Sequence, residues 1–219
     1  MFSYTELKAR HREVREQEHE NLRLRVHRAL SWLGRAEQAE DVDARFIFLW
    51  IAFNAAYAYE IDERYRLSER ATFRQFLEKL CALDTENRLG KLAWEEFAGP
   101  IRALLDTPWI LPDFWQYQRG DIAERQWRDK LAEGNRTARK ALKGGNTAAL
   151  LGVLLQRIYT LRNQIMHGGA TWNGRVNRQQ LEDCAALLGK LMPVIISLMM
   201  ENPGTVWGDP CYPVVKENP

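Results

Sequence analysis

The chain has 219 residues, of which 46% are hydrophobic and 11% aromatic, and its formal net charge at pH 7 is +2. This composition excludes an intrinsically disordered chain, and the small net charge means that any nucleic-acid contact must come from a local basic patch. The three cysteines (Cys81, Cys184 and Cys211) lack the spacing of a metal site or a disulfide framework. We therefore expect a soluble protein of the reducing cytoplasm.

The first half of the chain is predicted to be helical. Residues 5–39 contain one glycine and no proline, and we expect one long, highly charged helix whose second half has a core-facing side. Residues 43–59 are apolar on nearly all sides and rich in alanine, which is typical of a buried central helix. Two further helices are expected at about 70–82 and 86–98.

Residues 99–120 are predicted to be irregular, because three prolines interrupt them. Their aromatic residues could stack on unpaired bases, but we favour the interpretation that they cover a core beneath the loop. These aromatic residues are Trp109, Phe114, Trp115 and Tyr117. A charged helix is expected from residue 121 to about 142, with the pair Gly144–Gly145 as its end.

Two long apolar helices are predicted next. The first covers residues 147–167 and ends at the pair Gly168–Gly169. The second begins near Asn177, where Gln180 three residues later suggests a capping box, and continues to about residue 201. We find no continuous apolar run long enough to span a bilayer and therefore expect no membrane partner.

The chain is interpreted as one all-α domain over residues 1–201, with residues of about 100–145 as an insertion. Residues 202–219 contain four prolines and are predicted to form an extended C-terminal tail. Trp207 and Tyr212 are the residues expected to attach this tail to the body of the protein.

The segment RNQIMH, Arg162 to His167, ends the helix predicted at 147–167 and carries the candidate catalytic residues. Asn163 and His167 are four residues apart and therefore neighbours on the helix, and Arg162 flanks them. The apolar stripe of this helix consists of Leu151, Leu154, Ile158, Leu161 and Ile165, whereas the opposite polar row consists of Gln156, Thr160, Asn163 and His167.

This segment resembles the R-x(4–6)-H motif of the HEPN family of helical ribonucleases, with Asn163 directly after the arginine. The resemblance implies an up-and-down helical bundle and a metal-independent endoribonuclease without a cofactor. In this chemistry a ribose 2′-hydroxyl attacks the adjacent phosphate. His167 would transfer a proton, Arg162 would bind the phosphate, and Asn163 would orient the histidine or bind the phosphate.

The resemblance also implies partners. RNA is the expected substrate, and a homodimer would bring two motifs to one cleft and so supply two histidines. A toxin–antitoxin or phage-defence role is implied, with a cognate antitoxin or a nucleotidyltransferase as the partner protein. The alternative is a HEPN-like module that binds RNA, a nucleotide or a partner protein without cleavage.

Supporting residues are predicted on other segments. Asn54 is either a buried amide, which we favour, or a partner of the motif, and Glu60 and Asp62 could contribute acidic groups to the site. A basic run near residue 140 either contacts the RNA backbone or forms a solvated helix face. Its cations are Arg136, Arg139, Lys140 and Lys143.

No metal site is predicted. His11, His19 and His27 recur every eight residues and lack the four-residue spacing of a helical metal site, so we expect them to be solvated. Arg12 and His19 also have the spacing of the R-x(6)-H pattern, but in this charged segment we assign them no function.

Overall fold

The computed structural model describes residues 2–58 and 69–212, and these residues form ten α-helices, one short π-helical segment (Leu92–Glu96) and no β-strand. The predicted all-α class is therefore confirmed. The helices are α1 (Tyr4–Val14), α2 (Glu20–Glu37), α3 (Val42–Tyr57), α4 (Glu69–Leu83), α5 (Arg88–Lys91), α6 (Ala98–Asp106), α7 (Pro112–Gln118), α8 (Glu124–Gly144), α9 (Thr147–Met166) and α10 (Arg178–Glu201).

The single helix predicted for residues 5–39 is wrong, because the chain turns between α1 and α2. The start of α2 is capped by His19, whose Nδ1 accepts a 3.2 Å hydrogen bond from the backbone N–H of Asn21. The turn lets α1 fold back on α2, where a Cβ at Gly34 would lie 2.6 Å from the Tyr4 ring. This close packing depends on residues far apart in the sequence, and local helix propensity does not reveal it.

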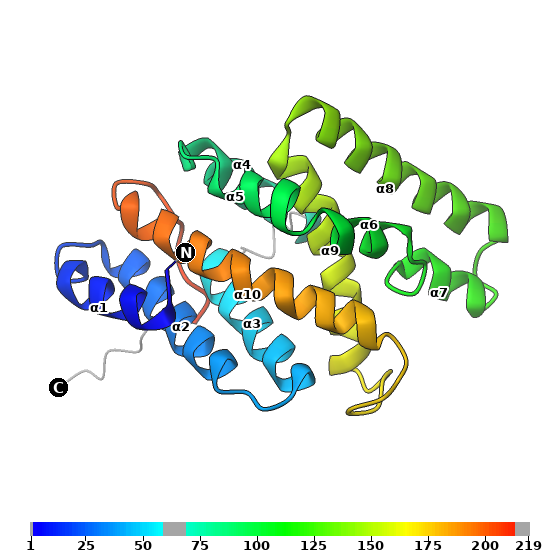
Figure 1. Cartoon of the computed structure of the whole chain (residues 1–219), viewed down its shortest axis with the longest axis horizontal. Helices are drawn as coiled ribbons and strands as arrows, with labels where there is room; N and C mark the ends of the chain where they lie inside the picture. Colours follow the sequence, from blue (N-terminus) through cyan, green and yellow to red (C-terminus); the bar gives the residue numbers. More distant parts are fainter. Residues whose placement is uncertain (1, 59–68, 213–219) are drawn as a thin grey trace.

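Helix α3 is the predicted central helix, and α2 and α10 pack on it (Figure 1). Phe46 and Phe53 on α3 are fully buried. The start of α3 is held by Asp41, whose carboxylate accepts the Ala44 N–H, and by an ion pair in which Arg178 of α10 donates to Asp43 at 2.7 Å. These contacts fix the angle at which α10 crosses α3.

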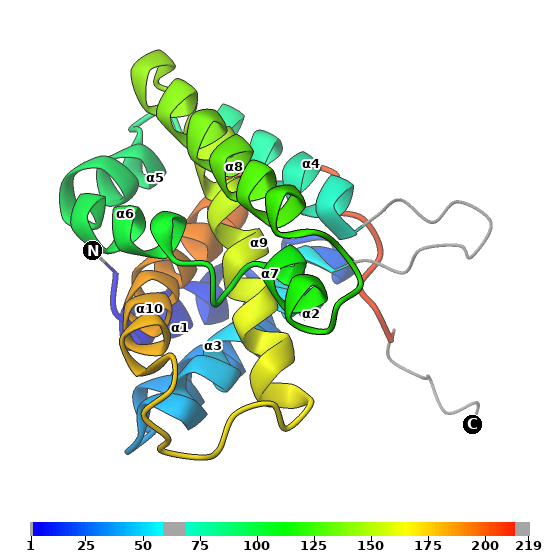
Figure 2. The ribbon, with the colours of Figure 1, turned by 90° about the vertical axis from the view of Figure 1, so that its right-hand side faces the viewer.

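Helix α9 lies between α4 and α8 in the other half of the molecule (Figure 2). Aromatic side chains join this half to α3: the ring centroids of Trp50 and Tyr159 are 5.9 Å apart, and those of Trp50 and Phe73 are 6.1 Å apart. One continuous hydrophobic core therefore extends from α2 to α9.

The prediction that residues 99–120 are irregular is also wrong, since they contain α7 and most of α6. Pro112 occupies the first turn of α7, where its missing N–H costs no helical hydrogen bond. Leu111, Phe114 and Trp127 form a second, small hydrophobic cluster between α7 and α8. The preferred interpretation of the aromatic residues as core cover is confirmed for Phe114, whereas Trp109 is 46% exposed.

Helix α10 is long and apolar enough to cross a membrane by length and composition, although no continuous apolar run in the sequence has this length. Its most apolar window is 78% buried inside the protein. Because α10 packs on α2, α3 and α6, its apolar composition is that of a core helix.

The segment after α10 lies against α2 and is held by the buried guanidinium of Arg25. Arg25 donates to the carbonyl oxygens of Gly208 and Asp209 and also to those of Ala56 and Ala58 at the end of α3. Burial lowers the pKa of Arg25 to about 10, which leaves it protonated at neutral pH.

The two predicted anchors of this segment differ. Trp207 is buried against Phe76, as expected, with ring centroids 6.3 Å apart. Tyr212 is 85% exposed, so its side chain is not an anchor, although its backbone carbonyl accepts a hydrogen bond from Arg28.

Candidate functional site

The predicted core stripe of α9 places the RNQIMH segment at one end of a buried helix. Leu151, Leu154, Ile158 and Leu161 are buried, and Ile165 is partly buried. The polar row on the opposite side is not continuous, because Thr160 is buried and its hydroxyl donates to the carbonyl of Gln156. The exposed functional surface is therefore restricted to the last turn of α9.

The glycine pair ends α9 as predicted and sets the position of His167. Gly168 has a φ of +71°, and its N–H bonds to the carbonyl of Ile165, while the N–H of Gly169 bonds to Gln164 at 2.7 Å. These two bonds form a Schellman motif. His167 is consequently the C-cap residue, with an exposed imidazole at the end of the helix.

Arg162 and Asn163 are in direct contact. An Nη1–H of Arg162 donates a 2.9 Å hydrogen bond to Oδ1 of Asn163, and the guanidinium carbon lies 6.0 Å from the Tyr159 ring centroid. Nε of Arg162 is buried without a hydrogen-bond partner. Arg162 forms no ion pair with a carboxylate within residues 2–58 and 69–212. Its positive charge is thus half-buried and, among the described residues, not neutralised by a neighbouring acid.

Of the three predicted catalytic residues, the structure brings the side chains of Arg162 and Asn163 into contact. The backbone N–H of His167 donates to the carbonyl of Asn163 at 3.0 Å, but among the described residues no hydrogen bond joins the His167 side chain to the side chain of Arg162 or Asn163. Asn163 orients the arginine, which leaves His167 free to face another molecule.

Gln164 is a residue of this segment that the sequence interpretation missed. Its Nε2 donates to the carbonyl of Trp109 at 2.6 Å, and its Oε1 accepts a 3.0 Å hydrogen bond from Asn177. Asn177 is the N-cap residue of α10, as the predicted helix start expects, but its side chain makes no cap hydrogen bond, so the predicted capping box with Gln180 is wrong. Gln164 instead fastens the end of α9 to the α6–α7 connection and to the start of α10.

Comparisons with known proteins give no family. Neither a scan of protein-family models nor searches of curated proteins and of solved structures found a match. The candidate site consequently stands on its residues and geometry alone.

Exposed apolar side chains lie close in sequence to this helix end. Met166 is 51% exposed, Trp172 is 74% exposed and Val176 is 72% exposed. Large apolar side chains with such exposure are a usual feature of protein–protein contact surfaces when they gather in one place. They occupy the last residue of α9 and the connection to α10.

The predicted supporting residues divide into two groups. Asn54 on α3 is half-buried rather than fully buried, so the preferred interpretation as a buried amide is wrong, and no hydrogen bond joins it to the motif among the described residues. Glu60 and Asp62 lie outside the described residues.

The predicted basic run forms an exposed stripe on α8. Its members recur at intervals of three or four residues, while Ala138 and Ala141 on the other side are buried. No ion pair to these four cations occurs within the described part of the chain, although other α8 cations such as Arg128 are paired. The stripe consists of Arg136, Arg139, Lys140 and Lys143. Its charge is available to a phosphate backbone.

Two buried groups were not recognised from the sequence. His11 is 4% exposed rather than solvated as predicted, and burial is the largest cause that lowers its pKa. Arg157 on α9 is also 4% exposed, and burial lowers its pKa to about 10. In the described ranges no group of three or more metal-binding side chains is present.

Proposed function

We propose that the chain is a metal-independent endoribonuclease of the HEPN type, in which the last turn of α9 forms half of a cleavage site. The observation that carries this proposal is the guanidinium of Arg162, which Asn163 holds and which has no acidic partner within residues 2–58 and 69–212, on the helix end that carries the exposed His167. A half-buried arginine without an acidic partner is suited to bind a phosphate whose charge grows in the transition state.

The proposed reaction uses the ribose 2′-hydroxyl as the nucleophile. One histidine removes the 2′-hydroxyl proton, the oxygen attacks the adjacent phosphorus, and the bond from phosphorus to the 5′ oxygen breaks. A second histidine protonates the departing 5′ oxygen, so the products carry a 2′,3′-cyclic phosphate and a 5′-hydroxyl. The ordinary pKa of histidine, about 6.5, suits both transfers near neutral pH.

One chain supplies one His167, so the proposal includes a homodimer in which two α9 ends face one RNA strand. The exposed side chains of Met166, Trp172 and Val176 support this arrangement, because they offer apolar surface next to the motif. A cytoplasmic toxin–antitoxin or phage-defence role, with an antitoxin or nucleotidyltransferase partner, belongs to the same proposal through the resemblance.

The test uses the full chain, single-stranded RNA and an excess of EDTA. We expect cleavage that leaves cyclic-phosphate ends, and His167→Ala and Arg162→Ala should each abolish it without loss of helicity or dimer. His19→Asn is the matched control, since asparagine retains a capping side chain at the start of α2. Unchanged cleavage in both motif variants would refute the proposal.

A second candidate function is RNA binding without cleavage, which the exposed stripe of α8 favours, because its four cations form no ion pair with the described residues. Here RNA would bind with a Kd that rises steeply with salt, and Arg139→Gln with Lys140→Gln would weaken binding. If RNA binds through this stripe while neither the wild type nor the His167→Ala variant cleaves it, the binding function replaces the nuclease.

A further inference from the structure

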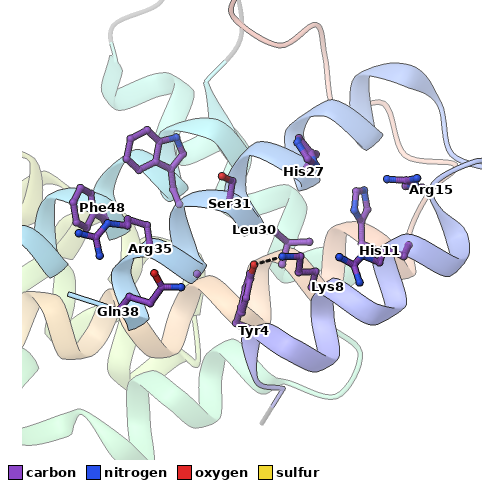
Figure 3. Close-up of a pocket in the computed structure, with 13 residues that line it drawn as sticks. Tyr4, Lys8, His11, Arg15, His27, Leu30, Ser31, Arg35, Gln38 and Phe48 are labelled. Carbon is purple, nitrogen blue, oxygen red and sulfur yellow. Dashed lines mark hydrogen bonds between the residues drawn. The ribbon is translucent and has the colours of Figure 1, made fainter. Parts of the chain in front are cut away.

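A groove between α1 and α2 lies on helices that the proposed cleavage site does not use. Its volume is about 650 Å³, within the roughly 300–1,000 Å³ of small-molecule sites. Figure 3 shows Tyr4 and Lys8 from α1 on one wall and Ser31 and Arg35 from α2 on the other. Phe48 from α3 closes one end.

The charge of the groove is strongly positive. Four of its thirteen lining residues are lysine or arginine, two are histidine, and none of these thirteen is acidic. Since the net charge of the whole chain is only +2, this is a local concentration of cations. Such a site attracts an anionic ligand.

The basic side chains of the groove differ in their interaction partners. Lys8 donates a 2.7 Å hydrogen bond to the hydroxyl of Tyr4, and Arg15 forms a 3.1 Å ion pair with the exposed Glu16. Arg12 is exposed and forms no ion pair within the described residues. The end of the groove next to the α1–α2 turn therefore has positive charge that is only partly neutralised.

His11 gives independent evidence of a binding site. Its imidazole is 4% exposed, and its Nε2 has no hydrogen-bond partner, although the carboxylate of the buried Glu18 lies 4.0 Å away. Together with Arg15 and His27, it lines both this groove and an adjoining hollow of about 350 Å³. A buried polar atom without a partner is costly, and a hydrogen bond to a ligand would satisfy it.

The opposite end of the groove is aromatic. The rings of Trp32 and Phe48 stack with centroids 5.7 Å apart, and the guanidinium carbon of Arg35 lies 5.0 Å from the Phe48 centroid. Planar aromatic and guanidinium groups in one place form a stacking surface of the kind that binds nucleobases. The ring of Tyr4 lies against Gly34 and forms part of the wall between the two ends.

We propose that the α1–α2 groove binds a nucleoside phosphate, with the base at Trp32, Phe48 and Arg35 and the phosphates at Arg12, Arg15 and His11. The same chemistry is present in a free nucleotide and in the phosphorylated end of an RNA strand. The proposal is independent of the cleavage site on α9 and requires no reaction there.

The first test is calorimetry with the His167→Ala variant, which retains the groove and, under the proposed nuclease function, does not cleave RNA. ATP should bind, and tripolyphosphate and adenosine should each bind about tenfold more weakly or worse, because each contacts only one end of the groove. Equal affinity for ATP and tripolyphosphate would overturn the proposal, as would failure of ATP and of a 5′-phosphorylated tetranucleotide to bind at millimolar concentration.

The second test uses matched variants in the same background. The double variant Arg12→Gln with Arg15→Gln should weaken ATP binding about tenfold or more. The control is Arg119→Gln with Arg125→Gln, which removes the same charge from the exposed surface of α7 and α8. This control should change the affinity for ATP less than about twofold. Phe48→Leu should weaken ATP but not tripolyphosphate. An unchanged ATP affinity in the Arg12–Arg15 double variant would overturn the proposal.

Competition between ATP and the tetranucleotide identifies the source of the ligand. Tighter binding of the tetranucleotide, weakened by the Arg12–Arg15 double variant, would support an RNA end as the ligand. Tighter binding of ATP with the same dependence would support a free nucleotide. If the wild type does not cleave RNA, the proposed nuclease function is refuted, but these binding measurements still test the groove.

Discussion

Arg162 is tied to Asn163, the next residue on α9, by a 2.9 Å hydrogen bond from Nη1 to Oδ1. Side chains of successive helical residues diverge by about 100°, so this bond requires the arginine to fold across the helix surface. Asn163 was expected to orient His167 or to bind the phosphate, whereas the contact gives it a third role, the placement of the guanidinium. The phosphate-binding group of the proposed site is therefore positioned by its neighbour.

Asn163→Asp should impair RNA cleavage, though less than Arg162→Ala, because a carboxylate in this position would neutralise the arginine without removing it. We expect a loss of about tenfold to a hundredfold in kcat/KM on single-stranded RNA. Gln156→Glu makes the same change of charge at a half-buried position two turns earlier on α9 and should have little effect. Equal activity of Asn163→Asp and the wild type would show that the guanidinium does not act on the phosphate.

Arg25→Met should release the segment after α10 and lower the stability of the whole fold. The buried guanidinium bonds to four carbonyl oxygens, and its removal takes one donor away from each of them. We expect a loss of about 2–4 kcal/mol in the free energy of unfolding by urea, with faster proteolysis after residue 202. Arg28→Met, which removes only bonds to Cys211 and Tyr212, should cost less.

The parts of this fold that follow from local signals could be predicted from the sequence. The ends of α8 and α9 depend on Gly145 and Gly168, whose φ values of +64° and +71° suit glycine and few other residues. The even hydrophobicity of the segment that forms α3 likewise reflects the central position of this helix, in which Arg45 is the one exposed residue. In each case the responsible residues lie within the element itself.

The remaining features depend on partners far away in the sequence. Residues 15–19 contain no glycine or proline, and the turn there brings Tyr4 of α1 onto Gly34 of α2. Asn177 has the identity of a helix cap but bonds to Gln164 instead. For the candidate site, residue identities and the helix end were predictable, whereas the contact of Arg162 with Asn163 required the structure.

Glu201→Gln should make the protein less stable at neutral pH, and the free energy of unfolding of the variant should fall less as the pH is lowered. Hydrogen bonds from Arg88, followed by those from Ser197 and Arg10, lower the pKa of Glu201 to about 2. A carboxyl with a lowered folded pKa stabilises the fold above its unfolded pKa of about 4.3, and this contribution is lost as the pH falls towards 2.

We expect the Glu201→Gln variant to lose about 1–3 kcal/mol at pH 7 and to differ less from the wild type as the pH is lowered from 5 to 2. Urea titrations at a series of pH values measure this directly. Glu86→Gln is the control, because Glu86 also lies near Arg88, at 3.9 Å, but is largely exposed. A constant difference across the pH range would show that Glu201 does not titrate with the fold.

Glu18→Gln should have the opposite effect and stabilise the protein at neutral pH. Glu18 is 9% exposed, both carboxylate oxygens lack hydrogen-bond partners, and burial raises its pKa. A carboxyl with a raised folded pKa contributes stability below its unfolded pKa of about 4.3, and that contribution is lost as the pH rises through the folded pKa. Arg10 is the cation that acts on Glu18, and it lowers this pKa less than burial raises it.

Because glutamine cannot ionise, the variant should be more stable than the wild type by about 1 kcal/mol at pH 7–8 and nearly equal to it at pH 4. Thermal unfolding at these pH values provides the measurement. His11 is the nearest candidate partner, with Nε2 at 4.0 Å from the carboxylate, but burial lowers its pKa and favours the neutral imidazole. A variant that is less stable at pH 7 would instead indicate a charged His11–Glu18 pair, and His11→Gln should then remove the difference.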